Sequence, residues 1–114
     1  MALTRAFKEV VADRAARDPE FRVALLTEAA DLFLSGDVDT GKAVLRDFIN
    51  ATIGFVRLSE TTGISAKSLM RMLGPEGNPS IRNLSTVFEA LQKAERLTLA
   101  VRAVSADRGD IEAA

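Results

Sequence analysis

The sequence contains no cysteine, histidine, tryptophan or tyrosine in its 114 residues, and six phenylalanines are its only aromatic side chains. Without cysteine or histidine, it has no thiol nucleophile, no Ser-His-Asp relay and none of the usual ligands of structural zinc or haem. Carboxylates alone could still bind Mg²⁺ or Ca²⁺, but no run of residues has the spacing of a calcium-binding loop. We therefore expect no catalytic residues, no metal site and no cofactor.

The chain also lacks a hydrophobic run long enough to cross a bilayer. The stretch Met1–Arg5 does not have the apolar core of a signal peptide. Hydrophobic residues make up 47% of the sequence, and the length fits one globular domain with a mostly aliphatic core. These features predict a cytoplasmic protein without a membrane partner.

Charge is nearly balanced overall, because 15 lysines and arginines are matched by 16 aspartates and glutamates. This balance argues against nonspecific coating of nucleic acid. Residues 55–103 nevertheless carry seven basic and only four acidic side chains. Such a locally basic segment allows a directed DNA-binding face, although an ordinary solvated helix surface has the same pattern.

Apolar residues recur at helical spacing through most of the chain. Asp18, Pro19 and Glu20 are typical of a helix start, while Gly36 and Gly54 are typical of helix ends. The predicted helices cover about residues 3–15, 19–35, 37–53, 56–62, 66–73 and 81–93.

Residues 97–103 alternate between apolar and other side chains, which predicts a short β-strand. A lone strand leaves its backbone N–H and C=O groups unpaired. We therefore expect this strand to pair with that of a second copy and so form a homodimer.

Residues 55–72 have the pattern of a helix-turn-helix, two short helices that cross steeply over a tight turn. Ser59 is a small residue for the helix contact, Gly63 fits the turn, and Ser65 can cap the second helix. Apolar residues occupy the positions expected to be buried, namely Leu58, Ile64, Leu69 and Met72. A helical hairpin that binds no ligand has the same pattern, so the motif predicts the geometry more firmly than a DNA partner.

At these residues the chain resembles the lambda-repressor-like helix-turn-helix class. The loop 74–79, the helix after Ser80 and the segment 97–101 make it similar, more narrowly, to bacterial addiction-module antidote proteins (HigA-type antitoxins). The resemblance covers about residues 39–103. The chain differs from the class at Ser59, where alanine is usual, and at 91–95, where Leu-Gly often ends the helix.

The resemblance and the helical periodicity together predict an all-α fold, a lambda-repressor-like helix-turn-helix domain with an N-terminal two-helix extension and a short C-terminal β-strand. Residues 1–36 lie outside the shared pattern and are expected to form the helical extension. Residues 37–104 are expected to form the DNA-binding domain with its strand, and residues 105–114 a flexible tail.

It also implies which side chains meet DNA. The start and outer side of the recognition helix would reach base edges in the major groove, and the start of the following helix would meet phosphate. The residues concerned are Ser65, Ala66, Lys67, Ser68, Met70 and Arg71 on the first, Ser80, Arg82 and Asn83 on the second, and Arg57 as a weaker phosphate contact.

The function that follows is sequence-specific binding of a double-stranded DNA operator by a transcriptional repressor, the antitoxin of a type II toxin-antitoxin operon, with a cognate toxin protein as a second partner. Two alternatives remain open. One is a stand-alone transcriptional regulator without a toxin, and the other is a helical protein-interaction module that no longer binds DNA.

The segment from Gly36 to Ala43 nearly matches the phosphate-binding pattern G-x-x-x-x-G-K-[ST], but we reject it as a nucleotide site. Ala43 replaces the hydroxyl residue that would bind Mg²⁺, and the preceding segment is predicted to be a helix rather than a strand. A glycine that ends one helix, followed by acidic capping of the next, accounts for these residues.

Overall fold

The computed structural model describes residues 5–107, and within this range it contains six α-helices. They are α1 (Arg5–Arg17), α2 (Pro19–Ser35), α3 (Val38–Ala51), α4 (Phe55–Thr62), α5 (Ala66–Met72) and α6 (Ile81–Glu95). The all-α architecture predicted from the sequence is confirmed. None of the helices in this part of the chain is long and apolar enough to cross a membrane.

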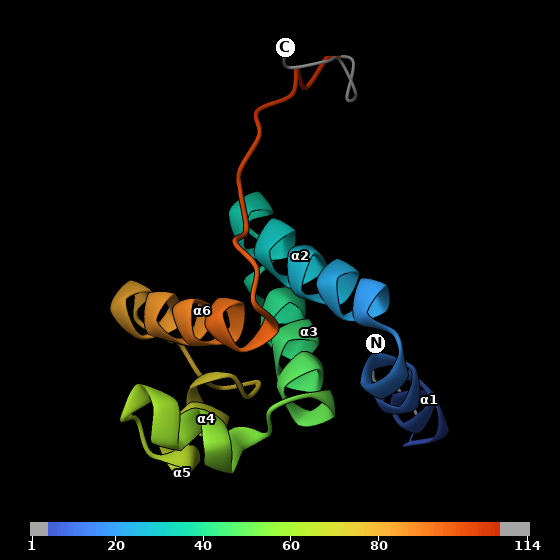
Figure 1. Ribbon diagram of the computed structural model, residues 1–114. Helices are drawn as coiled ribbons and strands as arrows, with labels where there is room; N and C mark the ends of the chain where they lie inside the picture. The colour runs from blue at the N-terminus through green and yellow to red at the C-terminus, as the bar shows by residue number, and fades with distance from the viewer. Residues whose placement is uncertain (1–4, 108–114) are drawn as a thin grey trace.

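Helix α3 stands at the centre of the arrangement, with α1 and α2 on one side and α4, α5 and α6 on the other (Figure 1). Its side chains Leu45, Phe48 and Ile49 are fully buried. The same continuous core takes side chains from four more helices, among them Leu26, Ala29, Leu58, Leu69, Val87 and Leu91. Because α2 contributes to this core, the helix-turn-helix does not bury its apolar face alone.

Local sequence explains the ends of α2. The Asp18 carboxylate accepts hydrogen bonds from the backbone N–H of Glu20 (3.1 Å) and of Phe21 (3.2 Å), and Pro19 occupies the first turn. At the other end Gly36 adopts a left-handed conformation with φ of 93°, which favours glycine. Asp37 then caps α3 by accepting from the Thr40 N–H. The helix start and stop predicted for this region are therefore confirmed.

The Asp18 cap makes stability depend on pH. The hydrogen bond from the Phe21 N–H, followed by contact with Arg14, lowers the pKa of Asp18 below its ordinary 3.8. A carboxylate with a lowered folded-state pKa stabilises the fold above its ordinary pKa, and this contribution is lost as pH falls through the folded-state value. We expect Asp18→Asn, which retains the cap but cannot titrate, to remove this part of the acid sensitivity. Thermal melts of both proteins at neutral and acidic pH measure it, and a difference that stays constant with pH would contradict the prediction.

The predicted C-terminal β-strand, and with it the strand assigned to the domain at 37–104, is wrong. Among the described residues no strand occurs. The segment after α6 passes α2 and then continues away from the helices (Figure 1). The alternation that suggested a strand has another cause. Leu97 and Leu99 pack against the helical core while Thr98 and Ala100 face solvent. Of the tail predicted at 105–114, residues 108–114 lie outside the described part.

Side-chain and cap contacts, rather than a neighbouring strand, hold the start of this segment. The Leu97 N–H donates to the Gln92 carbonyl oxygen (3.0 Å), and the Leu99 N–H donates to the Gln92 side-chain oxygen (2.7 Å). Arg96 ends α6 in a left-handed conformation, with φ of 58°. A strand requires a second extended backbone, and alternation in one segment does not supply one.

Candidate nucleic-acid interface

Helices α4 and α5 form the predicted helix-turn-helix. Gly63 ends α4 in a left-handed conformation with φ of 79°, and its N–H donates to the Ser59 carbonyl. A residue with a β-carbon is strained at this angle, so glycine is what allows the chain to turn at once into α5. Leu58 and Leu69 are fully buried, and half-buried Ser59 lies on the same helix as Leu58. The other two positions predicted to be buried, Ile64 and Met72, are half-buried and pack against the core.

Ser65 caps α5, which has seven residues. Its hydroxyl oxygen accepts from the Ser68 N–H at 3.1 Å and lies 2.9 Å from the Ser68 hydroxyl. Ala66 and Ser68 are half-buried, whereas Ser65, Lys67, Met70 and Arg71 are exposed. The outer side of α5 therefore presents two cations and a flexible apolar side chain to solvent.

The start of α6 carries the second group of predicted DNA contacts. Ser80 caps this 15-residue helix by accepting from the Asn83 N–H at 3.1 Å. Arg82 is exposed beside the cap, and the apolar Ile81 is 79% exposed. No acidic residue lies in the first turn of α6. The helix therefore begins with the positive end of its dipole and an exposed cation, an arrangement that favours an anion such as phosphate.

Arg57 is separated from the other predicted contacts. It is exposed on α4, but it lines a hollow together with Arg22, Thr52 and Glu95, on the side where α2 and α6 form an ion pair. It is therefore grouped with α2 and the end of α6 rather than with the outer side of α5.

Three cations of the motif and the cation at the start of α6 have no carboxylate partner within the described residues. Across residues 5–107, no carboxylate lies within 4.0 Å of the charged nitrogen atoms of Arg57, Lys67, Arg71 or Arg82. Some cations elsewhere are paired within the protein, such as Arg22 with Glu95 at 3.0 Å, while Lys8, Arg46, Arg96 and Arg102 also lack a carboxylate at this distance among residues 5–107. Positive charge without an internal partner is available for phosphate.

Two residues of α3 that were not predicted as site residues from the sequence hold the end of α5 and the loop after it. Lys42, which is only 3% exposed, donates to the carbonyl oxygens of Gly77 (2.6 Å) and Pro75 (3.5 Å). Arg46 donates to the carbonyl oxygen of Leu73 at 2.6 Å. The sequence pattern that could have indicated the burial of Lys42 is its position three residues before buried Leu45, on the apolar face of α3. The lysine of the rejected nucleotide pattern thus binds the protein's own loop.

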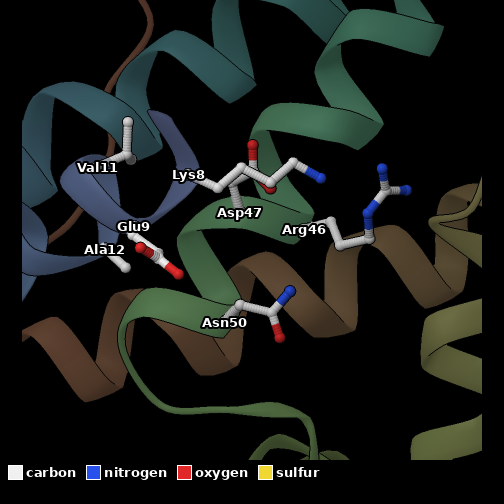
Figure 2. A pocket seen from close by; sticks show the side chains of 7 residues that line it. All are labelled: Lys8, Glu9, Val11, Ala12, Arg46, Asp47 and Asn50. Carbon is white, nitrogen blue, oxygen red and sulfur yellow. The ribbon is translucent and has the colours of Figure 1, made fainter. Parts of the chain in front are cut away.

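The hollow between α1 and α3 does not have the side chains of a catalytic or metal-binding site. Figure 2 shows this hollow of about 490 Å³, lined by Lys8, Glu9, Val11, Ala12, Arg46, Asp47 and Asn50. It mixes two cations with two carboxylates, and the Arg46 guanidinium in it points away from Val11 and Ala12. In the described part of the chain, no three acidic side chains lie together as metal ligands would.

Compared with protein-family models, curated proteins and solved structures, the chain matches none.

Proposed function

We propose that the protein is a sequence-specific DNA-binding transcriptional repressor, without catalytic activity, that inserts α5 into the major groove of an operator. The observation that carries this proposal is the exposed outer side of α5 after the Gly63 turn, where Lys67 and Arg71 have no ion-pair partner among the described residues. Arginine and lysine are the side chains that most often read guanine or neutralise phosphate. The start of α6, with Ser80, Arg82 and Asn83, would bind the neighbouring phosphates.

The proposal includes a homodimer, because repressors with this motif bind two half-sites one turn of DNA apart. Within the proposed class, an antitoxin that also binds a cognate toxin protein is the more specific form. A DNA-bound repressor acts where the DNA is, which in bacteria is the cytoplasm. Co-purification with the product of a small neighbouring reading frame would distinguish the antitoxin from a regulator without a toxin.

A gel-shift assay with the DNA upstream of the protein's own gene tests the proposal. We expect a discrete complex that persists at moderate salt, while an unrelated duplex of equal length binds only at low salt. This difference arises because nonspecific binding depends on phosphate contacts alone. If the protein binds neither duplex at low salt, the proposal is wrong and the protein-interaction module becomes the better explanation.

A further inference from the structure

The segment 73–79 is the covalent connection between the two proposed DNA-contacting helices, α5 and α6. Its conformation sets how far the α5 side chains Lys67 and Arg71 lie from the cap of α6. Two backbone hydrogen bonds shape it. The Gly74 N–H donates to the carbonyl of Arg71 in α5 (3.1 Å), and the Gly77 N–H donates to the Gly74 carbonyl (3.0 Å). The remaining support comes from outside, through three carbonyl oxygens that accept from α3.

Lys42 is almost completely removed from solvent, and its ammonium group is bound by the protein. It donates to the carbonyl oxygens of Gly77 and Pro75, and the carboxylate of Asp39 lies 3.5 Å away as its ion-pair partner. Burying a lysine is costly unless its charge is paired and hydrogen-bonded. The position on α3 is therefore specialised for holding this loop rather than for filling the core.

Arg46 lies one helical turn after Lys42 and holds the other end of the same segment. Its Nη1 donates to the Leu73 carbonyl at 2.6 Å, and Leu73 is the residue that ends α5. A cation at this point satisfies a carbonyl that the helix leaves free and interacts favourably with the helix dipole. Lys42 and Arg46 thus bind the backbone at the end of α5 and in the loop before α6.

We infer that Lys42 and Arg46 are positioning residues that set the spacing of α5 and α6 for DNA, an inference that rests on the proposed function. Neither side chain reaches DNA in this arrangement. They act through the carbonyl oxygens of Leu73, Pro75 and Gly77. Specific binding requires both helices to meet the duplex in register, whereas nonspecific phosphate binding tolerates a change in their spacing.

The test compares Lys42→Met and Arg46→Met with the wild type. Methionine keeps most of the side-chain length but removes the charge and the donors. The affinity ratio between the upstream DNA and an unrelated duplex should fall about fivefold or more, the loss expected when one base contact is misplaced. Affinity for the unrelated duplex should change little, because Lys67, Arg71 and Arg82 remain. Arg46→Lys, which can still donate to Leu73, should restore part of the ratio.

Arg22→Met is the matched control. Arg22 is also partly buried, and it binds a backbone carbonyl, that of Ala15 at 2.8 Å, as well as the Glu95 carboxylate, but at a site away from the loop. This variant should leave the affinity ratio unchanged. If it lowers the ratio as much as the α3 variants do, or if both α3 variants keep the wild-type ratio, the inference is wrong.

Amide hydrogen exchange provides a readout that needs no DNA. Lys42→Met and Arg46→Met should speed exchange in residues 73–83 and leave the core of α3 protected, whereas Arg22→Met should not affect residues 73–83. If the wild type binds no DNA, the proposed function fails, and faster exchange confined to 73–83 still supports the positioning role. Unchanged exchange in both α3 variants overturns it. Should Lys42→Met fail to fold, the result for Arg46→Met, whose side chain is less buried, tests the inference by itself.

Discussion

Replacing Arg71 by alanine is expected to weaken binding to the upstream DNA by about 1–3 kcal/mol, the value of one bidentate contact to guanine. Arg71 is exposed in the last turn of α5 and has no ion-pair partner among residues 5–107, so its planar guanidinium is free to meet a base edge. Binding to operator variants changed at single positions should show relaxed preference at one base pair. The measurement is a titration of wild type and variant against this set of duplexes.

Lys67 provides a contrast, because an ammonium group is a point charge that suits phosphate better than a base edge. Lys67→Ala should lower affinity evenly across the operator variants and reduce the slope of log affinity against log salt by about one unit. Arg17→Ala, an exposed cation on α1, is the control and should leave DNA affinity unchanged. If Arg17→Ala weakens binding while the Arg71 and Lys67 variants bind like wild type, the DNA-binding face is wrongly placed.

Replacing Gly77 by alanine should destabilise the fold by about 1–3 kcal/mol and disturb the end of the recognition helix. A β-carbon at Gly77 would overlap the carbonyl oxygens of Arg71 and Met72, which belong to the backbone and cannot turn aside as a flexible side chain would. The loop would have to move away from α5, and the Lys42 bond to the Gly77 carbonyl would be lengthened. Chemical denaturation measures the loss of stability, and the gel shift measures the loss of specific binding.

Gly74→Ala is the control in the same loop. A β-carbon there would lie 3.3 Å from the Met70 carbonyl oxygen, a tight contact that a small shift relieves. Neither glycine has a positive φ, so backbone strain does not distinguish the two positions. Gly74→Ala should change the free energy of unfolding by less than about 1 kcal/mol. Equal stability of the two variants would show that the loop is not held against α5.

Several helix ends are predictable because the physical cause lies within a few residues of each end, although Gly54, predicted to end the third helix, instead precedes α4, and α3 ends at Ala51. Asp18 and Ser80 accept hydrogen bonds from N–H groups two or three positions later, and Gly36 and Gly63 supply backbone angles that other residues adopt at a cost. The helix-turn-helix followed from the same local rules. Its small, flexible and apolar residues are spaced for two short helices joined by a tight turn, and α4 and α5 are joined in this way at Gly63.

The alternation after α6 does not predict the structure of this segment correctly, because it is a local pattern with a nonlocal cause. Leu97 and Leu99 point inward to meet the helical core, and that direction was implied by their spacing. Whether a second backbone runs beside them depends on the path of the whole chain. A period of two therefore indicates which side chains are buried, but not that the segment is paired.

The contacts that hold the loop between α5 and α6 are long-range and could not be predicted from the sequence. Lys42 and Arg46 lie more than 25 positions before the carbonyl groups that they bind, and lysine or arginine on a helix is ordinarily a solvated side chain. Backbone carbonyls carry no sequence signature, so no motif could indicate these partners. Capping and turn formation depend on neighbours along the chain and can be inferred from its residues. The burial of a cation against a distant loop depends on how α3 packs against the segment 73–79, which only the folded chain establishes.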